Sequence, residues 1–374
     1  MVSREAPTDT RARAYHRRQL ARSLGELLLT AAYLILLVHT RAAAYLAERV
    51  AAWTPRWWLA LAVVALVLAG GYRLLSLPLA WLGGFWLPRR YGLLHQSLGR
   101  WLWDAAKAAL IGGPLGLLAV EIVYGLMRWS PWWWLWSAVI FLGGYALLAL
   151  VAPVWLVPLF YRLTPLPDGP LKSRLLTLAA RVGVPVTGVW VVDQSRKSRT
   201  ANAAVTGLGR TRRILLFDTL LDSFTPDEVE AVLAHELAHQ VHGDIRRGLL
   251  VQGVLTLVTF WVASGALRAG GTWLHLDGPA DIAGLPLFGL VLLVVGLAAL
   301  PAANGWSRHV EHAADRFALE TLPGPGPFIG AMERLATLNL AERDPHPVEE
   351  FFLYSHPPIG RRIAYARQFL RDLT

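Results

Sequence analysis

Long hydrophobic stretches, separated by short polar ones, fill the first 160 residues of the chain and return between residues 248 and 306. Several of them reach the roughly 20 residues that a helix needs to cross the hydrocarbon core of a bilayer. The pattern predicts six membrane-spanning helices with approximate bounds 24–45, 57–87, 105–127, 132–160, 248–267 and 285–306. The second is interrupted by Gly70-Gly71-Tyr72-Arg73 and is long for a straight crossing, so we expect it to be tilted, kinked or partly outside the bilayer.

Two regions, residues 161–247 and 307–374, are soluble in character. The first region is predicted to contain an amphipathic helix at about 171–182 and a small sheet with strands at 186–193, 203–206 and 213–217. Gly207-Leu208-Gly209 predicts a hairpin turn between the last two strands. In the second region, we expect a helix over residues 307–318 that emerges from the sixth span, and a basic amphipathic helix at about 360–370.

Composition supports a polytopic membrane protein over two soluble domains. The chain has 374 residues, of which 55% are hydrophobic and 17% charged, and its mean hydropathy is +0.41. The net charge of +10 does not indicate nucleic-acid binding, because the basic residues do not cluster on one soluble face. They lie mainly in loops and in the first 23 residues, which lack the features of a cleavable signal peptide and are expected to be a cytoplasmic tail. With no cysteine, any metal must be bound by histidine and carboxylate.

The strongest chemical signal is His235-Glu236-Leu237-Ala238-His239. Thr225 is a suitable N-cap, Pro226 suits the first helical position, and Glu228 completes a capping box, so a helix is predicted from here through about residue 240. Histidines four residues apart then share one face of that helix.

Two imidazoles on one face can bind a single Zn²⁺, and Glu236 beside them can take a proton from the attacking water. The alternative is a chance match to this motif on a solvated helix, which the capping context disfavours. His242 adds a third imidazole on the same face, and we interpret it as flanking the site, with a ligand role as the alternative.

A catalytic zinc with two histidines needs a third protein ligand. Glu311 is the candidate, and Asp315 follows one helical turn later, where it could orient a ligand histidine through the second ring nitrogen. Without the zinc motif, these two carboxylates would be interpreted as a solvated helix face. Glu121 lies inside the third predicted span, where a carboxylate is expected to face a polar cavity or the interface.

Several further motifs, taken with the zinc motif and in chain order, resemble the type I CAAX prenyl protease family of integral-membrane zinc metalloproteases. The resemblance covers roughly residues 85–370. The motifs are Arg90-Tyr91-Gly92-Leu93, Pro158-Leu159-Phe160 with Thr164-Pro165-Leu166-Pro167, Asn202-Ala203, Arg213-Ile214-Leu215-Leu216-Phe217-Asp218-Thr219-Leu220, Ser307-Arg308, Glu311 with Ala314-Asp315, and Ser355-His356-Pro357-Pro358 with Arg362.

The resemblance implies a role for each matching residue. His235, His239 and Glu311 would bind zinc, and Glu236 would be the general base. Asn202, on a predicted edge strand, would help to hold the substrate backbone, while His356 and Arg362 would stabilise negative charge at the substrate carbonyl. In this family the membrane helices surround a water-filled chamber that the zinc site faces, and Glu121 would belong there.

Some features depart from the eukaryotic members of this family. Six spans are predicted where those members have seven, and Arg361 stands where they carry glutamate. His242-Gly243-Asp244 is similar to related bacterial membrane proteases that remove damaged membrane proteins, and the composition suits a prokaryotic source. The resemblance therefore supports the catalytic mechanism of the family more strongly than it supports a CAAX substrate for this chain. Cleavage of peptide or protein substrates at the membrane is expected, with membrane-protein quality control as the alternative.

The predicted architecture is a polytopic α-helical membrane protein with a small α+β zincin-like protease domain on the cytoplasmic side of a prokaryotic cell membrane. Its expected parts are the tail (1–23), a membrane region of four spans (24–160), a soluble part with the zinc helix (161–247), two further spans (248–306) and a C-terminal part that completes the zinc site (307–374). A non-catalytic scaffold is disfavoured because the expected base and ligands are present. A transporter is disfavoured because the two halves lack matching interrupted helices.

Overall fold

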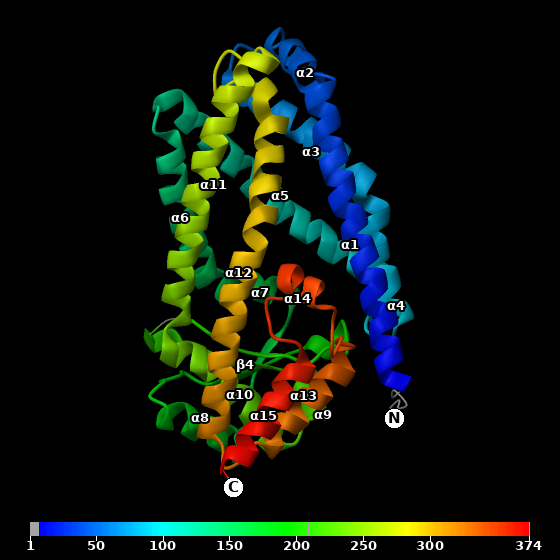
Figure 1. Ribbon diagram of the computed structural model, residues 1–374, viewed down its shortest axis with the longest axis vertical. Coiled ribbons are helices and arrows are strands. Elements are labelled where there is room, and N and C mark those ends of the chain that lie inside the picture. The colour runs from blue at the N-terminus through cyan, green and yellow to red at the C-terminus, as the bar shows by residue number, and fades with distance from the viewer. Residues whose placement is uncertain (1–6, 208, 374) are drawn as a thin grey trace.

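The computed structural model describes residues 7–207 and 209–373. Six helices in this part are long and apolar enough to cross a membrane, as predicted. They cover Asp9–His39, Trp57–Arg90, Leu98–Trp129, Trp133–Phe160, Asp244–Leu274 and Ile282–Thr321. In Figure 1 they fill the upper part of the molecule, and the strands and shorter helices gather below, at the end where both chain termini lie.

The helices of the membrane part are α1 (Pro7–His39), α2 (Ala42–Ala51), α3 (Trp57–Trp81), α4 (Leu87–Arg90), α5 (Leu98–Trp129), α6 (Trp133–Val151), α7 (Val157–Phe160), α11 (Asp244–Leu274) and α12 (Leu285–Thr321). The stretch expected to be a tail over residues 1–23 is helical from Pro7 onward, because it is the first half of α1. Helix α5 likewise begins at Leu98, seven residues before the predicted start of the third span.

The second span is not interrupted at Gly70-Gly71, since α3 runs through both glycines. The irregularity lies later, where a π-helical turn at Leu82–Trp86 joins α3 to α4. At Gly83 a β-carbon would lie 2.2 Å from the Cδ atom of Arg22, so the absence of a side chain lets α1 pack closely here. A second π-helical turn, at Ala152–Leu156, joins α6 to α7.

A four-stranded sheet supports the soluble end. Its strands are β1 (Leu163–Pro165), β2 (Val189–Val192), β3 (Ala203–Thr206) and β4 (Arg213–Phe217), in the order β1-β2-β4-β3. The predicted strands over residues 203–206 and 213–217 are confirmed and pair antiparallel, with Ala203 opposite Leu216. Strand β2 pairs parallel with β4, and β1, which the sequence did not suggest, pairs antiparallel with β2. Strand β3 is therefore an edge strand of this sheet.

The helices around the sheet are α8 (Pro170–Arg181), α9 (Asp218–Ser223), α10 (Pro226–His242), α13 (Gly326–Asn339), α14 (Pro347–Leu353) and α15 (Ile359–Leu373). All of them except α14 share one hydrophobic core with β2, β3 and β4, in which Leu233 and Leu237 of α10 are fully buried. Because one face of α10 is buried in this core, the orientation of the helix is set, and with it the position of the face that carries His235 and His239.

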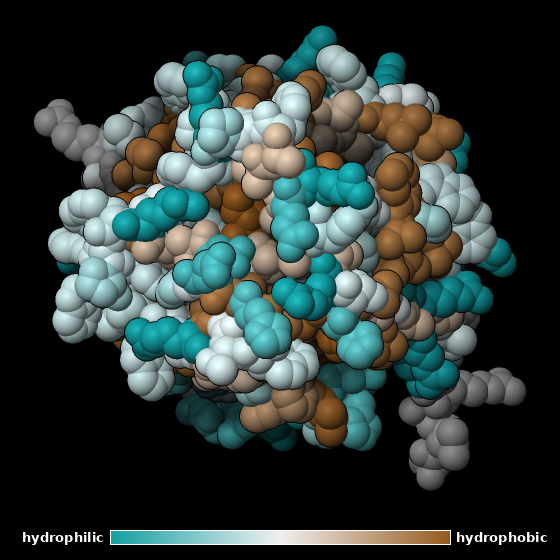
Figure 2. Space-filling view, turned by 90° about the horizontal axis from the view of Figure 1, so that it is seen from above, coloured by the Kyte–Doolittle hydropathy of each residue, from teal (hydrophilic) through white to brown (hydrophobic). Residues whose placement is uncertain are grey.

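The surface of the helical part is apolar over much of its area, as contact with lipid requires. Large exposed hydrophobic side chains include Leu74, Leu110, Trp155 and Leu250, each at least 70% exposed. Figure 2 views the end that carries α2 and the α11–α12 connection, where hydrophilic residues lie over much of the face, with hydrophobic ones between them and at the rim. The arrangement fits an integral membrane protein whose two ends reach water.

Candidate active site

Helix α10 begins with the capping box that the sequence predicts. The hydroxyl of Thr225 accepts a hydrogen bond from the N–H of Glu228 at 3.3 Å, and the Glu228 carboxylate accepts one from the N–H of Thr225 at 2.8 Å. The helix ends at Gly243, which has φ +67°, a conformation that glycine adopts without strain. Both ends of the helix are thus fixed by local sequence.

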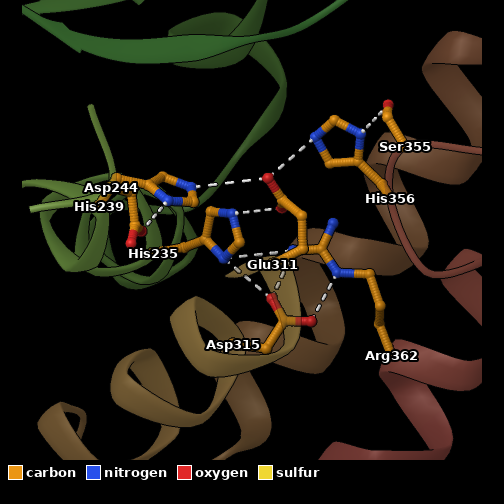
Figure 3. Close-up of polar contacts among 8 residues, drawn as sticks. All are labelled: His235, His239, Asp244, Glu311, Asp315, Ser355, His356 and Arg362. Carbon is orange, nitrogen blue, oxygen red and sulfur yellow. Dashed lines mark hydrogen bonds and ion pairs between the residues drawn. The ribbon is translucent and has the colours of Figure 1, made fainter. Parts of the chain in front are cut away.

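Two histidines of α10 meet a glutamate of α12 (Figure 3). The Nε2 atom of His235 lies 3.1 Å from Oε2 of Glu311, and Nε2 of His239 lies 3.7 Å from Oε1 of the same carboxylate. One ligand atom from each of the three residues lies within 4.8 Å of the other two. Residues 76 positions apart in the sequence therefore form one compact donor set.

A carboxylate lies behind each of the two imidazoles. Asp315 Oδ1 is 2.9 Å from Nδ1 of His235, and Asp244 Oδ2 is 3.0 Å from Nδ1 of His239. Each carboxylate favours a proton on Nδ1, which leaves the lone pair of Nε2 directed toward Glu311. Asp244 was not expected from the sequence as part of the site. It follows Gly243, whose left-handed turn returns the chain toward His239.

The arrangement fits a bound divalent cation better than an empty donor set. Lone pairs on two Nε2 atoms facing one carboxylate repel each other unless a cation or a proton lies between them. Oε2 of Glu311 is buried and accepts no well-aligned hydrogen bond from the described residues, although His235 is close. Burial lowers the pKa of His235, but the neighbouring carboxylates of Asp315 and Glu311 outweigh burial and raise that pKa to about 9. Two imidazoles and a carboxylate are also a common ligand set for metals in hydrolases.

Arg362 neutralises the charge of Asp315. Its Nε donates to Oδ2 at 2.8 Å and its second nitrogen to Oδ1 at 2.5 Å, so the pair is bidentate. Asp315 is 1% exposed and Arg362 is 9% exposed, so this ion pair is buried. Arg362 also reaches the lining of the cavity beside the histidines.

A cavity of about 790 Å³ opens beside the donor set, and Glu236 and Asn202 both line it. Burial raises the pKa of Glu236, and the nearby histidines oppose that effect. Asn202 is exposed, next to the edge strand β3.

His356 also lines the cavity, and its Nε2 lies 3.2 Å from Oε1 of Glu311. Burial lowers the pKa of His356, and the Glu311 charge opposes this. Of the eight predicted site residues, five line this cavity, and the other three, His239, Glu311 and Asp315, are direct neighbours of His235.

Two groups of residues near the site were not expected from the sequence. Arg308 of α12 donates to the backbone carbonyls of Glu350 and Tyr354 at 2.9 and 2.6 Å, which ties the loop before His356 to the helix that carries Glu311. Tyr15, His16 and Gln19 of α1 line the same cavity. Arg308 belongs to the Ser307-Arg308 motif of the family resemblance, but no role was assigned to it from the sequence. The three α1 residues lie within residues 1–23, which were expected to be a tail.

Two sequence candidates lie outside the donor set. His242 packs edge-on against Phe317, with ring centroids 5.6 Å apart, in keeping with its interpretation as a flanking residue. Glu121 lies on α5 and its Oε1 is buried without a hydrogen-bond partner among the described residues.

Comparisons with known proteins agree with this geometry. The sequence model of peptidase family M48 matches residues 165–369, and that of the CAAX prenyl protease N-terminal region, described as five membrane helices, matches residues 5–162. The uncharacterized metalloprotease YhfN of Bacillus subtilis is 31% identical over 79% of this chain and 70% of its own length. CAAX prenyl protease 1 of Saccharomyces cerevisiae is 31% identical over 78% of this chain and 68% of its own.

A solved structure is similar as well. The crystal structure of S. mikatae Ste24p superposes with a TM-score of 0.82 at 25% identity, covering 96% of this chain and 88% of that one. Family matches over both halves of the chain, a shared fold and a histidine–glutamate donor set agree with one another. The chain therefore belongs to peptidase family M48, and it is an integral-membrane metalloprotease homologous to the CAAX prenyl proteases.

Proposed function

We propose that the protein is a zinc endopeptidase that cuts peptide or protein substrates at the membrane. The observation that carries this proposal is the set formed by His235, His239 and Glu311, with Glu236 beside it in the cavity. Two ligand atoms held by one tetrahedral zinc are about 3.4 Å apart. The observed separations of 3.1 and 3.7 Å between imidazole nitrogens and the Glu311 oxygens lie on either side of that value.

In this mechanism His235, His239 and Glu311 hold the zinc, while Asp315 and Asp244 keep the two imidazoles in the ligating tautomer. When bound, zinc polarises the scissile carbonyl and lowers the pKa of water. Glu236 accepts the proton of the attacking water and later delivers it to the departing amine. The raised pKa of Glu236 suits such a shuttle, because a carboxylate that binds a proton more tightly is a stronger base toward the attacking water.

The substrate is held by other groups that line the cavity. Asn202, exposed beside the edge strand, donates to or accepts from the peptide backbone. His356 and Arg362 supply donors and positive charge where the carbonyl oxygen becomes negative. The Nδ1 atom of His356 lies 2.9 Å from the Ser355 hydroxyl and its Nε2 lies 3.2 Å from Oε1 of Glu311, so the ring is next to the proposed zinc ligand.

We further propose that the soluble end faces the cytoplasm of a prokaryotic cell. The basic start of α1, with Arg11, Arg17 and Arg18, lies at the same end as the sheet, and positive charge favours the cytoplasmic side. We propose the following division of the chain. Residues 1–23 are the basic segment, residues 24–160 and 248–306 contain the membrane spans, and residues 161–247 together with 307–374 form the protease part.

The experiment that tests this function uses Glu236→Gln as a substrate trap. Glutamine keeps the shape of the side chain and leaves the zinc ligands intact, but it removes the base, a step worth about 10²- to 10⁴-fold in rate. Protein termini are compared between cells that carry the parent and cells that carry the variant. A narrow set of C-terminal cuts supports a CAAX-protease-like role, and scattered cuts in damaged membrane proteins support quality control. A variant that cleaves a test peptide as fast as the parent would refute the mechanism.

A further inference from the structure

Strand β3 starts next to the cavity, whose lining includes Ala201 and Asn202, and the directions of its backbone groups can be assigned from the sheet register. Phe217 donates its N–H to the carbonyl of Asn202 at 3.1 Å, so Asn202 faces β4. Backbone groups alternate in direction along a strand. The backbone groups of Ala201, Ala203 and Val205 therefore face the open edge, where a substrate strand would pair.

One end of this edge is covered by Asn339, the last residue of α13. Its Oδ1 accepts a hydrogen bond from the N–H of Ala201 at 3.0 Å, and its Nδ2 donates to the Ala201 carbonyl at 3.2 Å. These are the two bonds that an adjacent strand would make to Ala201. The next residue, Leu340, has φ +48°, a conformation that non-glycine residues rarely adopt, and it ends the helix at this point.

The other end of the edge is covered by Gln240, which directly follows His239. Its Nε2 donates to the carbonyl of Val205 at 3.3 Å, and its Oε1 accepts from Nε of Arg212 at 2.9 Å. The contact with Arg212 fixes the orientation of the amide, so that its NH₂ group faces β3. The carboxamide of Asn339 therefore covers the edge at Ala201, and the carboxamide of Gln240 covers it at Val205.

Between Asn339 and Gln240, the backbone groups of the edge remain available for pairing with a peptide. Among the side chains that the structure describes, none bonds to the Ala203 carbonyl or to the N–H of Val205. The N–H of Ala203 is covered only by the Oδ1 atom of its neighbour Asn202 at 2.9 Å, and that side chain is exposed and able to turn away. Asn202 is also the residue proposed to hold the substrate.

We propose that Asn339 and Gln240 determine how much of a peptide can pair with the sheet. They confine pairing to the stretch from Ala203 to Val205 and force the peptide to leave the sheet at Ala201. Beyond that point it enters the part of the cavity lined by Tyr15 and His16 of α1. This proposal rests on the proposed proteolytic function. The simpler alternative is that the two amides only protect an exposed edge from aggregation, which would leave cleavage of peptides unaffected.

The test uses full-length, zinc-loaded protein in detergent and a synthetic peptide selected from a random library for cleavage by the parent. The peptide is lengthened one alanine at a time at either terminus, and KM is measured for each length. In the parent, KM stops falling once the peptide covers the open stretch. In Asn339→Ala, the groups of Ala201 become available, and KM falls further, on the order of tenfold, when one terminus is extended.

Gln240→Ala provides a second measurement, which frees the Val205 end of the edge instead of the Ala201 end. Ala201 and Val205 lie on opposite sides of Ala203, so this variant must respond to extension of the other terminus, whichever way the peptide runs. Each KM is compared within one variant, so a change in zinc content alters kcat and leaves the length profile unchanged.

Two further variants control for effects on folding. Arg199→Ala removes the hydrogen bonds to the carbonyls of Thr337 and Leu338 at the end of α13 but leaves Ala201 covered, so it should keep the parental length profile. If Asn339→Ala does not fold, Asn339→Asp keeps an acceptor for the Ala201 N–H and frees only the carbonyl, with a smaller effect of the same kind.

The possible results separate this proposal from the function on which it rests. Identical length profiles in the parent, Asn339→Ala and Gln240→Ala would overturn the proposal while leaving the protease intact. So would a response of both variants to the same terminus. A parent that cuts no library peptide would refute the proposed function, and this proposal with it.

Discussion

Removing the charge of Asp315 should damage the protein in two separable ways. Asp315 accepts two hydrogen bonds from Arg362 and faces Nδ1 of His235 at 2.9 Å. Asp315→Asn leaves the shape of the side chain nearly unchanged but removes the carboxylate that is paired with the buried guanidinium of Arg362. It also replaces an anionic partner of the ligand histidine by a neutral one.

The size of each effect follows from burial. Breaking a buried ion pair by neutralising one partner costs about 3–5 kcal/mol of folding free energy, because the other charge stays buried. Removing both charges, as in Asp315→Leu with Arg362→Met, is much less costly and can be neutral. Metal affinity should behave differently. Losing the partner of a ligand histidine weakens binding by about 10- to 100-fold, and the double variant lacks that partner too.

The assay combines thermal unfolding of detergent-solubilised protein with competition for zinc by a chelator. We expect the single variant to be the least stable, the double variant to recover most of the lost stability, and both to bind zinc more weakly than the parent. A double variant as unstable as the single one would show that the ion pair is not the origin of the loss. Parental zinc affinity in Asp315→Asn would show that the carboxylate does not support His235.

Three further predictions test other parts of the site and the topology. Glu311→Ala should lose zinc on purification while the detergent-solubilised protein stays folded, and an unchanged zinc content by elemental analysis would place the third ligand elsewhere. Arg308→Ala should release the loop that carries His356 and lower kcat at least tenfold with zinc content unchanged; a parental kcat would show that the loop is held by other contacts. Because the chain has no cysteine, single cysteines at Asp222 and Asp277 can be labelled from outside intact cells. Labelling at residue 277 and protection at residue 222 is the result expected for a cytoplasmic protease end, and the reverse pattern would refute that orientation.

The parts of the site that sequence predicts well are those fixed by local interactions. Thr225, Pro226 and Glu228 determine where α10 begins, and the start of the helix determines which face carries His235 and His239. The strands over 203–206 and 213–217 were predictable for the same reason, because composition and a glycine turn lie within a few residues.

The parts that sequence misses depend on contacts between distant segments. Whether Glu311 meets the histidines depends on how α12 packs against α10, and sequence left a solvated helix face as the alternative. Tyr15 and His16 were placed in a tail because arginines around them are polar. In the structure that stretch is helical and contacts the protease end, where His16 Nε2 lies 3.0 Å from Glu349. Amphipathic residues near a membrane boundary are compatible with both a tail and the first turns of a membrane helix. Only the tertiary packing of this stretch distinguishes the two.

The position of Glu311 connects the reaction to the membrane. Helix α12 runs without a break from Leu285 in the membrane part to Thr321 at the protease end, and it carries Glu311, Asp315 and the loop anchor Arg308 on one continuous helix. Helix α10, which supplies both histidines, is fixed in the core around the sheet, and Ala318 and Leu319 near the end of α12 belong to the same core. The donor set therefore depends on how the last turns of α12 pack against α10. A soluble fragment that lacks α12 would keep the histidine motif but lose the third donor and the support of His235. In this protein the helix that supplies the third donor is also one of the six helices long and apolar enough to cross the membrane, so the proposed site is built partly on a membrane helix.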